Sequence, residues 1–242
     1  MLEFLKLVGS HGLAELLAAS MLLAVVMTVG GWRSVRWVGL CLSAMWGAYL
    51  TLGMPIVAHL LADSLTTWRP SIDLSALPPP GAIMVLSGDN PDGRAREALR
   101  AHQTWPAAPV VVLGEAWFLG TLQGKGIPLA AMTQNPVPDN TLEQMVAVFE
   151  FAQRHSGSPP AVIASTLQMP RVKAFAEGLG VTLEFLPTAI DDEPSRAGAA
   201  RWWPTIGARR ISREALYEHA ALVYYRWRGL GVSRVADSAY TR

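Results

Sequence analysis

The chain lacks the residues on which several functional classes depend. It has one cysteine, Cys41, which lies inside an apolar run, so the polar part of the chain has no disulfides and no Cys/His cluster has zinc-site spacing. The formal net charge is only +1, so no strong overall field favours nucleic acid as a partner. No G-x-S-x-G elbow or P-loop occurs, and His102, His155 and His219 have no serine or cysteine at recognisable spacing.

Long apolar runs fill residues 1–62. One run covers about 13–31 and a second covers 37–62, separated by "WRSVR". About 20 apolar residues cross a bilayer, so the two runs predict a transmembrane helical hairpin over 1–62. A cleaved signal peptide is the alternative for the first run, and the lack of Ala-x-Ala-like cleavage residues after it argues against that.

The charges beside these runs predict their orientation. Arg33 and Arg36 lie in the connector, whereas the amino end carries Glu3, Lys6 and Glu15. The positive-inside rule places the connector in the cytoplasm and residues 70–242 on the outer side, with the lipid bilayer as a partner.

The remaining sequence alternates apolar runs with helix patterns. A proline-rich linker over 63–80 precedes a domain over 81–232 and a tail over 233–242. Strands are predicted at 82–87, 109–114, 127–133, 160–165 and 181–187, and helices at 92–103, 116–124, 139–155 and 168–179. This alternation predicts an α/β fold whose mainly parallel sheet has helices on both faces.

Polar side chains follow several of the predicted strands. The carboxyl ends of parallel strands meet at one edge, and helices that begin there direct N–H groups and a positive dipole end towards it, which suits an anion. Turn formation and helix capping are the alternative roles for Asp89, Asn90 and Asp92, and a surface salt bridge is the alternative for Arg171. The residues expected at this edge are Asp89, Asn90, Arg94, Glu115, Ser165 and Arg171.

Four stretches carry a family resemblance. In chain order, "MVLSGDNPDGRAREAL", "VVVLGE", "GIPLAAM…DNTLEQM" and "VIASTLQMPRVKAFAEGLGV" resemble the ElyC/SanA/YdcF family of bacterial envelope-associated proteins, over roughly residues 80–230 and including the closing helix pattern "REALYEHAALVYYRWRGL". The resemblance implies a Rossmann-like α/β fold and a role in cell-envelope or peptidoglycan biogenesis, without a settled reaction. Two membrane segments ahead of a periplasmic domain resemble the ElyC-type arrangement and imply a multi-pass protein of the bacterial inner (cytoplasmic) membrane.

The resemblance is specific at some positions and breaks at others. Matching positions are Gly88 and Arg94; Asn140, Thr141 and Glu143; and Ser165, Met169 and Arg171 in the pattern Ser-x-x-His-Met-x-Arg. The histidine of that pattern is Gln168, the asparagine usual after Glu143 is Gln144, and the acidic residue usual before Asn-Thr is Gln134. Gln168 can form hydrogen bonds but cannot act as a general base near neutral pH.

These patterns lead to three hypotheses. The first is an inner-membrane-anchored periplasmic protein that binds a phosphorylated or otherwise anionic, for example lipid-linked, envelope precursor. The second is a hydrolase or transferase that uses an acid pair, with a divalent ion held by oxygen ligands. The third is a scaffold module, or one that binds a nucleotide-like ligand such as S-adenosylmethionine. No cofactor, metal ligand or protein partner is assigned.

The predicted site residues fall into two groups. The candidate catalytic acids are Asp89 and Glu115. The candidate ligand-binding residues are Gly88, Asn90, Arg94, Gly114, Asn140, Thr141, Glu143, Ser165, Gln168 and Arg171. Separately, Trp202-Trp203-Pro204 with Arg201 and Arg209-Arg210 nearby is typical of a loop packed on its domain, with a membrane contact or a cover over the pocket as the alternatives.

Overall fold

The chain forms two compact units. The computed structural model describes residues 20–23, 25, 33–65, 72–88, 90–155, 157–190 and 197–228. One unit, here called the helical unit, comprises Met1–Leu65 and Asp192–Ala221. The other, the α/β unit, comprises Thr66–Asp191 and Leu222–Arg242, so the division falls within helix α9 (Ile206–Trp227).

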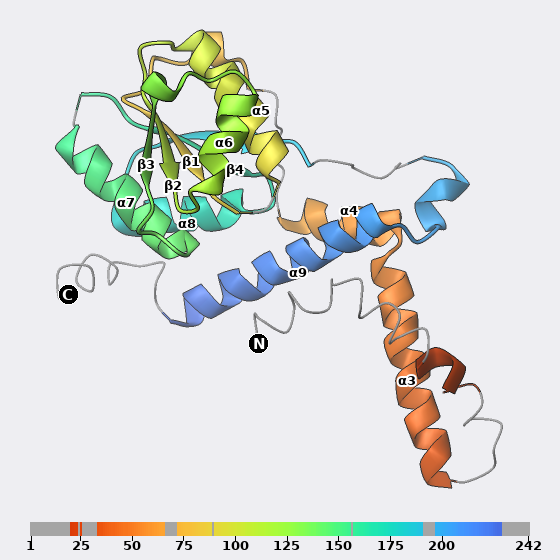
Figure 1. Ribbon diagram of the computed structural model, residues 1–242. Coiled ribbons are helices and arrows are strands. Elements are labelled where there is room, and N and C mark those ends of the chain that lie inside the picture. Colours follow the sequence, from red (N-terminus) through yellow and green to blue (C-terminus); the bar gives the residue numbers. More distant parts are fainter. Residues whose placement is uncertain are drawn as a thin grey trace. The chain divides into compact units, whose positions relative to one another are not determined.

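The α/β unit is built on a five-stranded sheet in which all neighbours are parallel. Its strands are β1 (Ile83–Leu86), β2 (Val110–Leu113), β3 (Met132–Asn135), β4 (Ala161–Ser165) and β5 (Glu184–Thr188). Their order is β3-β2-β1-β4-β5 (Figure 1), the order of the first five strands of a Rossmann fold. The predicted α/β class and Rossmann-like parallel sheet are therefore confirmed.

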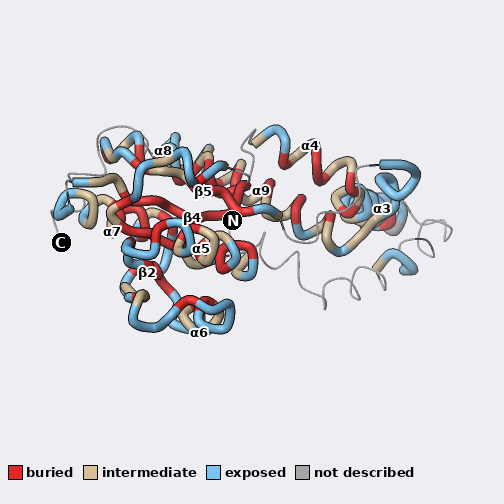
Figure 2. The backbone as a smooth tube through the Cα atoms, turned by 90° about the horizontal axis from the view of Figure 1, so that it is seen from above, coloured by how far each residue is buried: buried red, intermediate tan, exposed pale blue. Residues whose placement is uncertain are grey.

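Helices cover both faces of the sheet, as predicted. Ile83 and Val85 face a core that includes residues of α5 (Pro91–Thr104) and α6 (Trp117–Gly124). Met84 and Leu86 face a second core with α7 (Thr141–Arg154) and α8 (Met169–Leu179). β1 and β4 are buried at every position, as Figure 2 shows for β4. Strands enclosed on both sides favour continuous apolar runs such as these.

The third strand starts later than predicted. Residues 127–133 were expected to be extended, but Leu129–Ala131 form a 3₁₀ turn, and β3 runs over Met132–Asn135. Because β3 is an edge strand, it is only partly buried and tolerates the polar residues Thr133 to Asn135, which weakens its hydrophobic signal.

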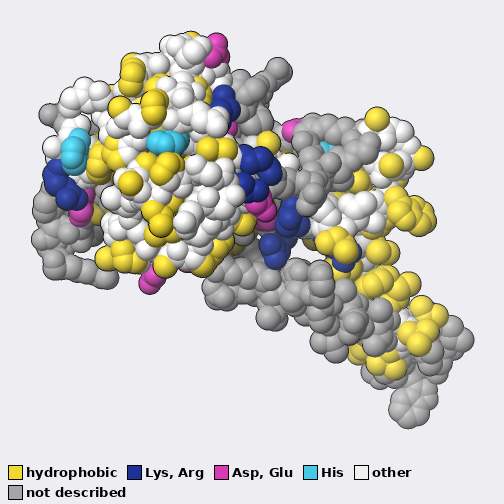
Figure 3. Space-filling view, turned by 45° about the horizontal axis from the view of Figure 1, so that its top comes forward, with side chains coloured by type: hydrophobic (Ala, Val, Ile, Leu, Met, Phe, Trp, Pro, Cys, Tyr) yellow, Lys and Arg dark blue, Asp and Glu magenta, His cyan; other side chains and the backbone are white. Residues whose placement is uncertain are grey.

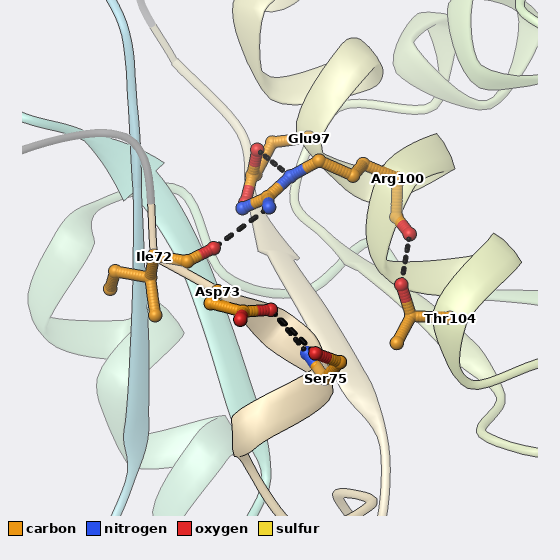
Figure 4. A network of polar contacts seen from close by, with 6 residues as sticks. All are labelled: Ile72, Asp73, Ser75, Glu97, Arg100 and Thr104. Atoms are coloured by element: carbon orange, nitrogen blue, oxygen red, sulfur yellow. Dashed lines mark hydrogen bonds and ion pairs between the residues drawn. The ribbon is translucent and has the colours of Figure 1, made fainter.

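Part of the predicted linker lies among the described residues. Helix α4 (Pro55–Leu65) continues beyond residue 62, and Leu74–Ala76 form a 3₁₀ turn whose Leu74 reaches the core. Arg100 of α5 fixes this segment, because its Nη1 donates to the carbonyl oxygen of Ile72 at 2.8 Å. The Glu97 carboxylate accepts from Nε and Nη2 of the same guanidinium (Figure 4).

The helical unit departs from the predicted hairpin. The second apolar run forms α3 (Arg33–Leu52) and α4, bent by 71° at a short break, rather than one continuous helix. Pro55 begins α4; it lacks a backbone N–H and disfavours helical geometry at Met54. Of the first run only residues 20–23 and 25 are described, and they are helical, so the structure does not show a hairpin.

The described helices give a mixed result on membrane spans. None is by itself long and apolar enough to cross a bilayer, whereas Arg36–Leu52 and Pro55–Leu65 together meet the requirement by length and composition.

A segment distant in sequence completes the helical unit. Thr205 donates its N–H to the carbonyl oxygen of Gly53 at 2.8 Å, and His219 Nε2 lies 2.9 Å from Ser64 Oγ. Helix α9 begins at Ile206, ahead of the pattern recognised from residue 213, because the Thr205 hydroxyl accepts from the N–H of Ala208 at its first turn.

Candidate functional site

The strand order identifies one place where a ligand crevice is expected. The chain passes from β1 outward to β2 and β3, and then returns to add β4 on the other side of β1. In open parallel sheets, ligands bind outside the carboxyl ends of the strands at such a reversal. The segments that leave β1 and β4, beginning at Ser87 and Thr166, border this position.

A chain of buried hydrogen bonds crosses the reversal. The guanidinium of Arg94, in the first turns of α5, donates from Nη1 to the carbonyl oxygen of Leu86 and from Nη2 to Gln168 Oε1 at 3.0 Å. Gln168 Nε2 in turn donates to Thr141 Oγ1 at 2.9 Å. Arg94 is 1% exposed and both partners are 7% exposed, so the end of β1 and the starts of α7 and α8 are linked out of contact with bulk water.

At two glycines of this edge, neighbouring side chains approach the backbone more closely than a β-carbon usually allows. Gly88 has φ +135°, and a β-carbon there would lie 3.3 Å from Arg94 Nη2. Gly114 has φ +103°, and a β-carbon there would lie 2.2 Å from Ser87 Oγ, closer than any real contact. Both positions therefore require glycine, Gly114 most strictly.

Gln144 is a side chain that the sequence analysis did not place in the site. Its Nε2 donates to Ser87 Oγ at 2.8 Å and to the carbonyl oxygen of Leu113 at 3.3 Å. Its Oε1 is buried and has no hydrogen-bond partner among the described residues, an arrangement that costs free energy unless a donor is supplied. Its position one helical turn after the N-cap residue Asn140 is the signal that could have identified it.

Three glutamines lie at this edge. Gln168 and Gln144 make the contacts above, and Gln134 Nε2 donates to the carbonyl oxygen of Gly114 at 2.9 Å. An amide side chain donates and accepts hydrogen bonds but does not exchange a proton near neutral pH. These three positions therefore supply hydrogen bonds without acid–base chemistry.

Capping, the alternative role for Asn90, is confirmed, and Asn140 caps α7 in a similar way. Asn90 adopts φ +58°, accepts from the N–H of Gly93 at 3.1 Å, and donates to the carbonyl oxygen of Ala189 at 2.5 Å, just after β5. Asn140 accepts from the N–H of Glu143, whose carboxylate accepts in return from Asn140 Nδ2 and from the N–H of Asp139. Both caps fix where a helix starts at the edge.

The other predicted residues are placed differently. Glu115 is exposed, and its carboxylate accepts a hydrogen bond from Trp117 Nε1. Arg171 is 4% exposed, which does not fit a surface salt bridge, and its N–H donates to the carbonyl oxygen of Gln168. Ser165 is also buried, and its carbonyl oxygen accepts from the N–H of Gln168 at 2.9 Å. Asp89 lies outside the described residues.

Two cavities open at the other edge of the sheet, where the strands begin. One, of about 490 Å³, lies before β2 and β3, and one of about 340 Å³ lies before β4 and β5. The larger is lined by His102, Pro106, Ala107, Ala108, Pro109, Pro128, Ala130, Ala131 and Thr133. Among the residues that the structure describes, no group of three His, Cys, Asp or Glu side chains could hold a metal ion.

The fold and this edge define a Rossmann-like α/β protein with a polar, hydrogen-bonded strand reversal. Comparison of the chain with protein-family models, curated proteins and solved structures found no match.

Proposed function

We propose that the α/β unit binds an anionic, phosphate-bearing precursor of the cell envelope at the carboxyl ends of β1 and β4. In this proposal the protein belongs to the ElyC/SanA/YdcF group that its motifs resemble. The apolar helices of the helical unit hold it in the bacterial inner membrane, with the α/β unit in the periplasm.

The observation that carries the proposal is the hydrogen-bond chain from Arg94 through Gln168 to Thr141. It joins three separate segments at the one place where this topology favours a ligand. The guanidinium of Arg94 is buried and donates to the carbonyl oxygen of Leu86 and to Gln168, so its positive charge lies at the carboxyl end of β1. The buried, unpartnered Oε1 of Gln144 adds an acceptor for a donor group of a ligand.

The expected ligand is an anion because of the charges that gather at this edge. The amino ends of α5, α7 and α8 are all at the carboxyl side of the strands, where their N–H groups and dipoles favour negative charge. Arg94 and Arg171 lie in the first turns of α5 and α8, where a cation opposes the helix dipole. A bound phosphate would place negative charge beside these helix N–H groups and beside the two guanidinium groups.

Binding is favoured over catalysis by the residues at the reversal. Its described side chains include three neutral glutamines, and the carboxylate of Glu143 is committed to capping α7. Glu115, the described member of the predicted acid pair, accepts from Trp117 on an exposed surface. No observation favours the hydrolase or transferase alternative specifically.

The test is binding of a polyprenyl phosphate to the full chain in detergent, measured by microscale thermophoresis. Gln168→Glu keeps the size of the side chain and pairs with Arg94, but places a negative charge where the phosphate is expected. Gln153→Glu makes the same change beside the cavity at the opposite edge, and serves as the matched control. Because hydrogen bonds to charged groups contribute about 1.5–3 kcal/mol, Gln168→Glu should weaken binding at least about tenfold.

The control variant should bind as the unaltered chain does. Equal weakening by the two variants, or binding that Gln168→Glu leaves unchanged, would place the phosphate elsewhere and overturn the proposal. A circular dichroism melt of each variant shows whether the fold is retained.

A further inference from the structure

A group of exposed aromatic and apolar side chains lies in the helical unit, outside the site described above. Trp202, Trp203 and Ile206 are 52%, 77% and 67% exposed, although they lie within five residues of one another. Single exposed apolar residues are ordinary on protein surfaces, whereas contiguous apolar patches are typical of contacts with a partner or a membrane.

The segment is held against the break between α3 and α4. Thr205 donates its N–H to the carbonyl oxygen of Gly53, the first residue after α3. The guanidinium of Arg209 lies over the ring of Tyr49, 4.5 Å from its centre. Both contacts are within the helical unit, so Trp202 to Ile206 are fixed beside the end of α3.

Helix α3 itself has a large exposed apolar surface, visible in Figure 3 as hydrophobic side chains along the helix. Its largest exposed apolar side chains are Trp37, Val38, Leu40, Met45 and Leu50. This surface stops at Leu52, where the helix ends, and α4 departs at 71°. The exposed Trp202–Ile206 segment is therefore continuous with the carboxyl end of an apolar helix.

The chemistry of the segment matches the boundary between hydrocarbon and water. Tryptophan is enriched at this boundary because its ring is apolar and its indole N–H is polar. The guanidinium of Arg201 lies 5.2 Å from the ring centre of Trp202, and arginine binds phosphate groups at two atoms. In a lipid bilayer with anionic headgroups, the phosphate groups that would bind Arg201 lie next to the hydrocarbon boundary that favours tryptophan.

We propose that Trp202–Ile206 is a second membrane contact, which lies in the headgroup region of the bilayer that holds α3. In this arrangement the rings of Trp202 and Trp203 enter the boundary of the acyl chains, and Arg201 binds headgroup phosphates. The inference rests on the membrane anchoring in the proposed function, and it adds a contact made by the carboxyl-terminal half of the chain.

The test uses the full chain reconstituted in vesicles of three parts phosphatidylcholine to one part phosphatidylglycerol. A nitrobenzoxadiazole label is attached at one cysteine at a time. The native Cys41 reports on α3, where it is exposed. In a Cys41→Ser background, Trp203→Cys reports on the segment and Leu129→Cys, an exposed position of the α/β unit, is the control. Quenching by aqueous iodide is compared with quenching by lipids carrying a spin label on the acyl chain.

The label at position 203 should be quenched by a spin label near the headgroup, and its iodide quenching constant should be at least threefold smaller than that of the label at 129. The label at Cys41 should be quenched by a spin label deeper in the acyl chain. If position 203 is as open to iodide as position 129, the inference is wrong. Shielding from iodide without lipid quenching would identify a protein occupant and also overturn it.

The Cys41 label separates this inference from the proposed function. Lipid quenching at Cys41 with an iodide-accessible position 203 leaves the anchor intact and removes only the second contact. Absence of lipid quenching at Cys41 contradicts the anchor itself.

The role of Arg201 has its own variant. Raising the phosphatidylglycerol content should increase shielding at position 203, and Arg201→Gln should remove that dependence because glutamine carries no charge. If shielding at position 203 still increases with phosphatidylglycerol content in the Arg201→Gln variant, Arg201 does not bind the headgroup phosphates.

Discussion

The two edges of the sheet are built in opposite ways. At the carboxyl edge, buried polar side chains hydrogen bond to one another and to strand carbonyls, as Arg94, Gln144 and Gln168 do. At the amino edge, two cavities of about 490 and 340 Å³ open among residues that include several prolines and alanines. Among the described residues, the two cavities and this group of buried polar side chains therefore lie at different edges of one sheet.

A buried polar group is a better guide to a binding site in this sheet than an open cavity is. The larger cavity is lined mainly by proline and alanine, whose side chains offer a ligand no hydrogen bonds. A buried arginine, by contrast, persists only if the surrounding structure compensates its desolvation. The carboxyl edge is therefore the better candidate for a binding site, even though the described cavities lie elsewhere.

Replacing Gly114 should have the largest effect. Gly114→Ala introduces a β-carbon that overlaps Ser87 Oγ at a φ that side chains rarely adopt, so we expect a loss of about 3 kcal/mol or more in the free energy of unfolding. Urea unfolding of the full chain in detergent measures it.

Gly120→Ala in α6 is the control, because a β-carbon there meets nothing within 4 Å. Within a helix this substitution should raise stability by roughly 0.5–1 kcal/mol. Equal effects of the two substitutions would show that the tight approach at Gly114 does not exist.

Replacing Arg94 should have the next largest effect. Arg94→Met leaves the Leu86 carbonyl and the Gln168 amide without their donor, which should cost about 2–3 kcal/mol of unfolding free energy. Arg100→Met on the same helix removes a partly exposed ion pair with Glu97 and the hydrogen bond to the carbonyl oxygen of Ile72, and should cost less, about 1 kcal/mol. If Arg100→Met lowers the unfolding free energy as much as Arg94→Met does, the buried polar contacts of the carboxyl edge contribute no more to stability than a partly exposed ion pair.

Asp73, outside both edges, should give a small dependence on pH. Hydrogen bonds from the Ser75 side chain and backbone, with the positive charge of Arg100, hold the pKa of Asp73 below its usual range. Its contribution is therefore present above the pKa of the unfolded chain, and is lost as the pH falls through the lowered folded value. Asp73→Asn should flatten the acid limb of stability against pH, whereas an identical limb would show that Asp73 contributes nothing.

Filling the larger cavity should have the smallest effect. Ala130→Leu narrows the space at the amino edge, and we expect polyprenyl phosphate binding and unfolding free energy to change by no more than about 0.5 kcal/mol. Binding measured as for Gln168→Glu is the readout. A tenfold loss would move the ligand site to the amino edge and reverse the comparison.

Sequence patterns predicted most of the α/β unit because its strands are enclosed on both faces. Runs such as "AIMVL" and "AVIAS" are apolar at consecutive positions, and turn residues bound them. The polar edge strand β3 had no such run, and its start was misplaced. The break in the second apolar run was missed although Pro55 signals it, because composition dominates an argument about membrane spans.

Sequence patterns predicted that Arg94 and the segment after β4 meet at the carboxyl edge, but not the hydrogen bonds that they make there. Parallel strands bring their ends together, so the convergence of Arg94 and the segment after β4 followed from topology. The hydrogen bonds from Arg94 to Gln168 and from Gln144 to Ser87 were not predicted. They depend on side-chain conformations, which the periodicity of a sequence does not determine.

The helical unit is formed by two segments that lie far apart in the sequence, so its parts are synthesised at different times. Ser64 and His219, which contact each other, are 155 residues apart in sequence. At 5–20 residues per second, a ribosome needs roughly 8–30 s to pass from one to the other. Helices α3 and α4 are therefore made long before the segment that completes their unit, and the whole sheet of the α/β unit is synthesised during that interval.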